Sequence, residues 1–242
     1  MVFRIGRSAV VEPIAPLEGA LNSTQTMLDV SGCGLRALDL SAYPKLQMLD
    51  CSNNQLTALD LSNTPDLRVL RCFNNQLVEL DLSHQSRLLE LYCNHNALWR
   101  LNLSTTPRLR RLWCFNNRLR VLDLAALAGL IELLCYNNAL ATLDLVPVIG
   151  LQILSCRTNQ LVELDLSFTP NLEILYCSDN QLTELNVSVT PDLEVLYCYG
   201  NQLTYLDVRS LASLEVLYCY HNQLAELDVA GSPKLRLVRW RE

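Results

Sequence analysis

What this sequence lacks already excludes several classes of protein. No apolar run approaches the roughly 20 residues that a membrane-spanning helix requires, so membrane insertion is not expected. The phosphate-binding patterns G-x-G-x-x-G and the Walker loop are absent, as is the G-x-S-x-G pattern of serine hydrolases. The C-x-x-C spacing from which zinc sites are built never occurs among the ten cysteines. The sequence therefore predicts no enzyme, no cofactor and no metal centre.

Positive charge and histidine are also scarce. The 242 residues carry a formal net charge of −6, with an isoelectric point near 5.1. A chain with this balance is not expected to bind nucleic acid or an anionic membrane surface. The three histidines, His84, His95 and His221, occupy unrelated positions, so the sequence indicates no catalytic pairing of histidine with cysteine.

What the sequence does contain is a cysteine at every twenty-first residue (72 − 51 = 21), and no insertion interrupts this spacing. A fixed period of this length indicates a solenoid, in which each repeat stacks on its neighbours and cannot bury its core alone. The nine cysteines in register are Cys51, Cys72, Cys93, Cys114, Cys135, Cys156, Cys177, Cys198 and Cys219.

Each repeat follows the pattern L-x-x-L-x-C-x-x-N-x-L-x-x-L-D-L-S-x-x-P-x, of which residues 172–192 are one copy. Leu175 and Cys177 alternate with outward side chains, as expected for a strand with one buried face. Leu182, Leu185 and Val187 predict a second extended segment that faces the first across a narrow core. The connector carries proline in most copies, which favours a turn over a helix.

The L-x-x-L-x-C-x-x-N-x-L half of this pattern resembles the hallmark of leucine-rich repeats. The short period and the L-x-x-L-D-L second half are similar to bacterial repeats related to internalins, especially the nested Irreko type, and the resemblance extends from Leu28 to Trp240. It implies a β-rich, α/β-type solenoid: a right-handed superhelix of about ten coils, with a parallel β-sheet on the concave face and little or no helix.

The repeat also predicts the domain organisation. Residues 1–27 are expected to form an N-terminal capping segment with a degenerate half-repeat, because terminal coils need cover. Residues 28–242 are expected to form one solenoid that ends in a partial coil. The N-terminus does not resemble a secretory signal, and many unpaired thiols favour a reducing compartment. We therefore expect a monomer located in the cytoplasm of a bacterium or, for an injected effector, in the host cytosol.

Three rows of side chains recur along the solenoid, and each has a structural interpretation. The asparagines equivalent to Asn180 are expected to satisfy buried backbone groups at a turn. The cysteines are expected to act as small buried apolar residues. For the aspartates equivalent to Asp165, hydrogen bonds to the local backbone are favoured over a row of calcium ligands, because one carboxylate per coil supplies few of the six to eight oxygens that calcium needs.

The outward face of the first strand carries the candidate site. Aromatic and branched apolar side chains stack there over three coils, and we call this set the tyrosine patch: Ile174, Tyr176, Val195, Tyr197, Tyr199, Val216, Tyr218 and Tyr220. A second group on the same face contains Tyr92, Trp113, Phe115 and Tyr136.

Exposed aromatic surface of this extent favours a protein-binding site, although an aromatic ladder that only stabilises the sheet is the alternative. We therefore predict a non-enzymatic module that binds a protein partner, such as a bacterial effector or scaffold. The alternatives are a glycan-binding surface protein and the targeting domain of an enzyme whose catalytic part lies outside this chain.

Overall fold

The computed structural model describes residues 24–241. It divides into two compact units, Met1–Leu119 and Arg120–Glu242, which we call unit 1 and unit 2. The strands in unit 1 are β1 (Met27–Asp29), β2 (Met48–Asp50), β3 (Val69–Arg71), β4 (Glu90–Tyr92) and β5 (Arg111–Trp113). The strands in unit 2 are β6 (Glu132–Leu134), β7 (Ile153–Ser155), β8 (Ile174–Tyr176), β9 (Val195–Tyr197), β10 (Val216–Tyr218) and β11 (Leu237–Arg239).

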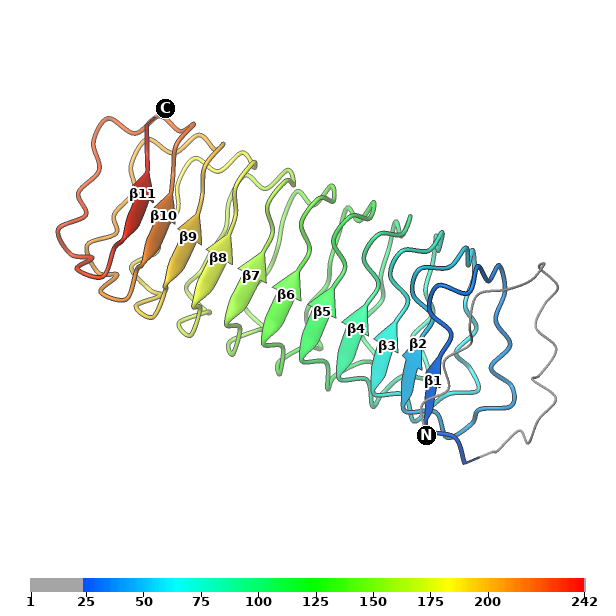
Figure 1. The fold of residues 1–242 in the computed structure, drawn as a ribbon. Helices are drawn as coiled ribbons and strands as arrows, with labels where there is room; N and C mark the ends of the chain where they lie inside the picture. The colour runs from blue at the N-terminus through cyan, green and yellow to red at the C-terminus, as the bar shows by residue number, and fades with distance from the viewer. Residues whose placement is uncertain (1–23, 242) are drawn as a thin grey trace. The chain divides into compact units, whose positions relative to one another are not determined.

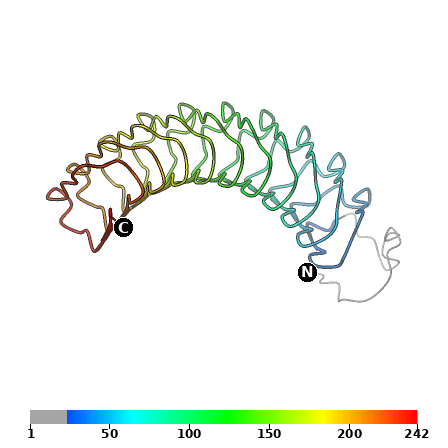
Figure 2. The same ribbon diagram turned by 90° about the horizontal axis from the view of Figure 1, so that it is seen from above.

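Within each unit, every strand pairs in parallel with the strand of the next coil (Figure 1). The register follows the 21-residue period: Leu175 is paired with Leu196, and Leu217 with Val238. Figure 2 shows the coils of each unit stacked one behind the next. The predicted leucine-rich solenoid with a parallel sheet is therefore confirmed, and residues 24–241 contain no helix.

In the coils of β2 to β10, the core is a ring of apolar residues, mostly leucines, closed by one cysteine. In the coil of β8, six apolar side chains are buried: Leu172, Leu175, Cys177, Leu182, Leu185 and Val187. The connector that follows the core segment is a turn, as the prolines predict; in the preceding coil the Thr169 N–H donates to the Leu166 carbonyl at 2.9 Å. The described part of the chain has no helix with the length and apolar character needed to cross a bilayer.

The second extended segment differs from the prediction, because it buries its leucines without forming a strand. Leu182 and Leu185 are three residues apart, and a regular strand would place their side chains on opposite faces. The Leu182 N–H donates to the side-chain Oδ1 of Asn201 at 3.0 Å. In a β-sheet this N–H would instead donate to a backbone carbonyl of the neighbouring strand. The aspartate row, expected on a second strand, therefore lies on an irregular segment.

Most of the predicted cap, residues 1–27, lies outside the described residues. Residues 24–26 are described, and β1 begins at Met27, where its partner is Met48. The capping role and the boundary at residue 28 stay predictions.

We call the asparagines equivalent to Asn180 the ladder asparagines. The residue directly before each of them adopts the left-handed backbone conformation, which sequence reasoning missed. Its φ is between 50° and 57° wherever the residue is not glycine. The residue types at this position could have predicted the conformation. They are mostly Asn, Gly, Asp and His, and these residues tolerate the left-handed region better than most. The non-glycine residues are Asn53, Asn74, His95, Asn116, Asn137, Thr158, Asp179 and His221.

Thr158 is the one β-branched residue at this position, with φ of 54°. The left-handed region costs an ordinary L-residue roughly 1–2 kcal/mol, and asparagine tolerates it better. We expect Thr158→Asn to raise the free energy of unfolding by about 0.5–1 kcal/mol, measured by urea denaturation. Thr183→Asn, at an exposed position without a positive φ, is the matched control and should leave stability unchanged. Equal effects in both variants would contradict the strain assigned to Thr158.

Candidate functional site: the aromatic face of the strands

The tyrosine patch is assembled by the strand register of unit 2. In β8, the side chains of Ile174 and Tyr176 are half-buried on either side of the fully buried Leu175. Parallel pairing places Tyr176 beside Tyr197, and Tyr197 beside Tyr218. The predicted residues therefore come together on one face, and the branched apolar side chains form a parallel row next to the rings.

The tyrosine rings contact one another directly. The centroids of Tyr176 and Tyr197 are 4.9 Å apart with the rings at 75°, and those of Tyr197 and Tyr218 are 4.4 Å apart at 27°. In the second row, Tyr199 and Tyr220 stack at 4.7 Å with only 4° between their planes. Because each ring is held by its neighbours, the patch is a preorganised surface rather than a set of independent side chains.

Two phenols of the patch, those of Tyr197 and Tyr220, have a raised pKa. Burial raises the pKa of Tyr197, and the neighbouring tyrosines raise it further. Burial is also the largest cause of the raised pKa of Tyr220. These hydroxyls therefore stay protonated at neutral pH, so each can donate one hydrogen bond as well as accept.

The second aromatic group is divided between the units. In unit 1 the rings of Tyr92 and Trp113 meet edge to face at 4.9 Å, and the Tyr92 hydroxyl donates to Glu90 at 2.9 Å. Phe115 was expected to be exposed but is only 8% accessible, so it mainly contributes to packing. Tyr136 belongs to unit 2, where the guanidinium of Arg157 lies 4.5 Å from its ring centroid.

The aspartate row caps turns, as predicted. Asp165 Oδ1 accepts the Ser167 N–H at 2.9 Å, and Asp60 does the same with Ser62 at 2.9 Å. The Ser62 backbone N–H is the largest cause of the lowered pKa of Asp60. No group of three or more His, Cys, Asp or Glu side chains in residues 24–241 could hold a metal ion. The hydrogen bonds to the local backbone give the row a structural role at the turns.

The cysteine row is buried and reduced. Cys51 to Cys219 are fully buried at every repeat, and none of them forms a disulfide in the described part of the chain. Burial raises the pKa of Cys156 to about 12, so its reactive thiolate is negligible at neutral pH. Cys33, outside the register, is only half-buried, and its Sγ lies 3.6 Å from the Ser31 carbonyl. The predicted packing role of the row is confirmed by this burial.

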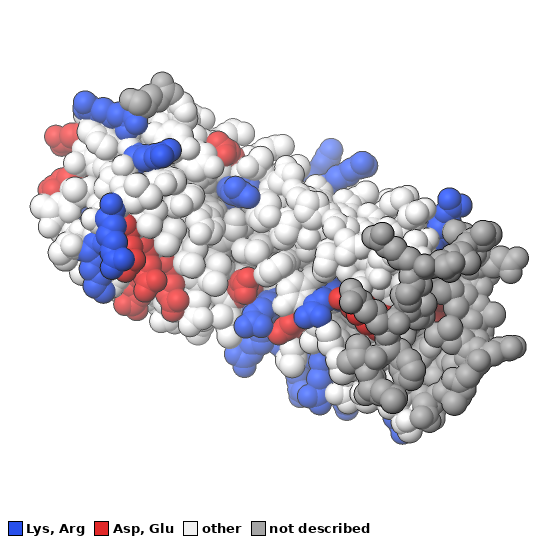
Figure 3. Space-filling view, viewed as in Figure 1, with Lys and Arg blue, Asp and Glu red and all other residues white. Residues whose placement is uncertain are grey.

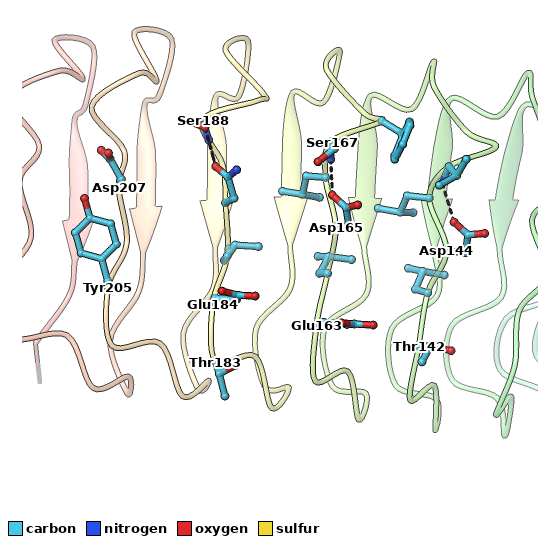
Figure 4. A pocket seen from close by; sticks show the side chains of 18 of the residues that line it. Thr142, Asp144, Glu163, Asp165, Ser167, Thr183, Glu184, Ser188, Tyr205 and Asp207 are labelled. Atoms are coloured by element: carbon cyan, nitrogen blue, oxygen red, sulfur yellow. Dashed lines mark hydrogen bonds between the residues drawn. The ribbon is translucent and has the colours of Figure 1, made fainter.

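Sequence reasoning missed a groove of about 1020 Å³ along the second segments of unit 2. Figure 4 shows Glu163, Asp165 and Glu184 projecting from neighbouring segments, with Tyr205 at one end. Most of the groove's aspartates already cap turns, and Asp207 is paired with Arg209 at 2.7 Å. The groove is acidic and open, and its walls belong to the irregular segments rather than to the strands.

A family model for leucine-rich repeats matches the chain at residues 44–84 and 170–212. Among solved structures, the functional domain of InlJ from Listeria monocytogenes is 33% identical, with a TM-score of 0.82 over 90% of this chain. That domain is described as including a cysteine ladder. YopM from Yersinia enterocolitica is 28% identical over 93% of this chain, with a TM-score of 0.70.

A leucine-rich repeat protein of Leptospira interrogans shares the fold, with a TM-score of 0.81 at 24% identity over 96% of this chain and 71% of its own length. This chain spans only 54% of the InlJ structure and 52% of the YopM structure. No curated protein matches the chain. The comparisons therefore concern the repeat region and not the activity of a whole protein.

Proposed function

Because the chain belongs to the leucine-rich repeat family, with repeats of the bacterial internalin-like kind, we propose that it binds a protein partner through the tyrosine patch and catalyses no reaction. The observation that carries this proposal is the continuity of the patch. Five tyrosine rings from three successive coils form two contacting rows, with ring centroids 4.4 to 4.9 Å apart within each row.

Two physical properties make this surface suited to binding. Tyrosine presents a large apolar ring with a polar hydroxyl, and such residues dominate the energetics of many interfaces. The rings stand on paired strands and support one another, so little side-chain entropy remains to be lost when a partner binds. Figure 3 shows that the surface over the strands of unit 2 is mostly uncharged, so a partner can cover it without desolvating many charges.

The similarity to bacterial leucine-rich repeat proteins supports a proposal for the biological setting. An intracellular scaffold or an injected effector, acting in the bacterial cytoplasm or in the host cytosol, is the role that we propose. The free, buried thiols of the cysteine row support a reducing compartment. The binding function resides in the repeats, whatever further domains accompany them.

A crosslinked pull-down read by mass spectrometry tests the proposal. The baits are the wild-type chain and a triple variant, Tyr176→Ser, Tyr197→Ser and Tyr218→Ser, whose fold is checked by circular dichroism. We expect a partner whose recovery falls about tenfold or more in the triple variant, because the variant loses the central row of rings. Tyr205→Ser removes an exposed tyrosine (61% accessible) outside the patch and is the control. Identical partners for all three baits would refute the tyrosine patch as the binding site.

A further inference from the structure

The tyrosine patch has an acidic border. Glu173, Glu194 and Glu215 directly precede β8, β9 and β10. The Glu194 N–H donates to the Glu173 carbonyl, and the Glu215 N–H to the Glu194 carbonyl, each at 2.8 Å. The backbone therefore holds the three side chains in one row along the edge of the patch. Figure 3 shows acidic side chains gathered at this edge of the uncharged surface, with basic side chains beside them toward the last coil.

This row is short of positive charge. Within residues 24–241, the carboxylates of Glu173 and Glu194 have no ion pair and no hydrogen bond, whereas Glu215 is paired with Arg236. The strand sides of the three coils (172–180, 193–201 and 214–222) contain no lysine or arginine. Because neighbouring strands lie about 4.8 Å apart, carboxylates at equivalent positions of successive coils repel one another. A cation bound along the row would relieve this repulsion.

The last coil shows which cation fits. The guanidinium of Arg239 lies over the ring of Tyr218, 5.4 Å from its centroid. Arg236, three residues earlier in the same segment, places Nη2 3.8 Å from Glu215 Oε1. One extended segment of this chain therefore supplies an arginine to the tyrosine row and another to the glutamate row.

We propose that the partner binds through an extended segment that presents arginine side chains, which stack on the tyrosines and form ion pairs with Glu173 and Glu194; this rests on the function proposed above. Arginine suits both rows because its planar guanidinium stacks on aromatic faces and donates two hydrogen bonds to one carboxylate. Lysine offers a point charge without the planar fork, and an acidic segment would be repelled by the row.

Selection from a random library of displayed peptides tests this proposal with the full chain. The library is selected in parallel on the wild-type chain, on the Tyr176→Ser, Tyr197→Ser, Tyr218→Ser variant, and on a Glu173→Gln, Glu194→Gln variant. The control variant is Glu163→Gln, Glu184→Gln, which removes equal charge from the groove on the irregular segments. Binding of the selected peptides is then measured by fluorescence anisotropy, together with versions in which each arginine is replaced by lysine.

We expect the peptides selected on the wild-type chain to be enriched in arginine. Their affinity should fall about tenfold on the Tyr variant, on the Glu173, Glu194 variant and with the lysine peptides, and stay unchanged on the control. Peptides that need the tyrosines but lack arginine, or that ignore Glu173 and Glu194, would overturn this inference and leave the proposed function intact. Selection that yields no peptide dependent on the tyrosines would count against both.

Discussion

Raising the pH above about 9 is expected to unfold the protein, and the buried cysteine row is the cause. Burial raises the pKa of the Cys51, Cys93 and Cys156 thiols from 9.0 to about 12. Cys72, Cys135, Cys177 and Cys198 are shifted in the same direction by the same cause. In the unfolded chain these thiols regain their ordinary pKa, so between pH 9 and 12 the unfolded state binds fewer protons than the folded state.

The sign and size of this effect follow from proton linkage. A group whose pKa is raised by folding stabilises the folded state fully below pH 9, and that stability is lost as the pH rises toward 12. Each such thiol lowers the free energy of unfolding by about 1.4 kcal/mol per pH unit in this window. Several thiols acting together can remove the typical stability of about 5–15 kcal/mol within roughly one or two pH units.

Far-ultraviolet circular dichroism in reducing buffer, with urea titrations at a series of alkaline pH values, measures this dependence. Replacing Cys156 or Cys177 by alanine should reduce the slope of stability against pH by about 1.4 kcal/mol per pH unit for each thiol removed. The slope is the decisive quantity because it is insensitive to the small cavity that each substitution leaves. A chain that keeps its full signal and stability at pH 11 would show that the thiols do not control alkaline unfolding.

Replacing a ladder asparagine is expected to be the most damaging polar substitution. The Nδ2 of Asn180 donates to the carbonyls of Cys156, Cys177 and Ser178 at 3.1 to 3.2 Å. Its Oδ1 accepts the Leu161 N–H at 3.0 Å, and the residue is only 9% exposed. Asn180→Ala leaves the buried Leu161 N–H without this acceptor and removes one of the two partners of each carbonyl, since Asn159, Asn201 and the Thr158 N–H still donate to them. We therefore expect a loss of about 3 kcal/mol in the free energy of unfolding.

Asn186 in the same coil provides the matched control. It is exposed, and its Oδ1 accepts the Ser188 N–H at 3.1 Å at a turn that water can reach. Asn186→Ala should therefore cost about 1 kcal/mol or less, because solvent replaces the lost hydrogen bond. Urea denaturation of the two variants compares them directly. Similar losses would mean that burial of the ladder amide does not set its contribution.

Sequence reasoning predicted the features that repeat at a fixed spacing. The step from Cys177 to Cys198 specifies the strand pairing of β8 with β9, and alternation around Leu175 places Tyr176 on the outward face. Sequence reasoning did not predict the local backbone conformation where single residues determine it. The i,i+3 spacing of Leu182 and Leu185 prevents a second strand, and a left-handed residue such as Asp179 is needed to turn the chain into the ladder asparagine.

The candidate site was predictable only in its position. The tyrosine rows follow from the period, but the burial of Phe115 depends on how neighbouring rings pack, which spacing does not encode. The groove along the irregular segments depends on the outward side chains of several coils together, with Tyr205 at one end. The acidic border was visible in the sequence as Glu173 and Glu194, but its lack of partners required the structure.

The ladder asparagines also bear on how such a chain can change in length over generations. Asn180 reaches back to the Cys156 carbonyl of the preceding coil, and Asn201 reaches back to Cys177 in the same way. Unequal recombination between gene repeats could remove residues 172–192. The side chain of Asn201 would then donate its hydrogen bond to the Cys156 carbonyl in place of the Cys177 carbonyl, and no backbone group would lose its partner. Coil number is therefore a heritable quantity that selection can adjust in whole steps, while the stack of tyrosines lengthens or shortens with it.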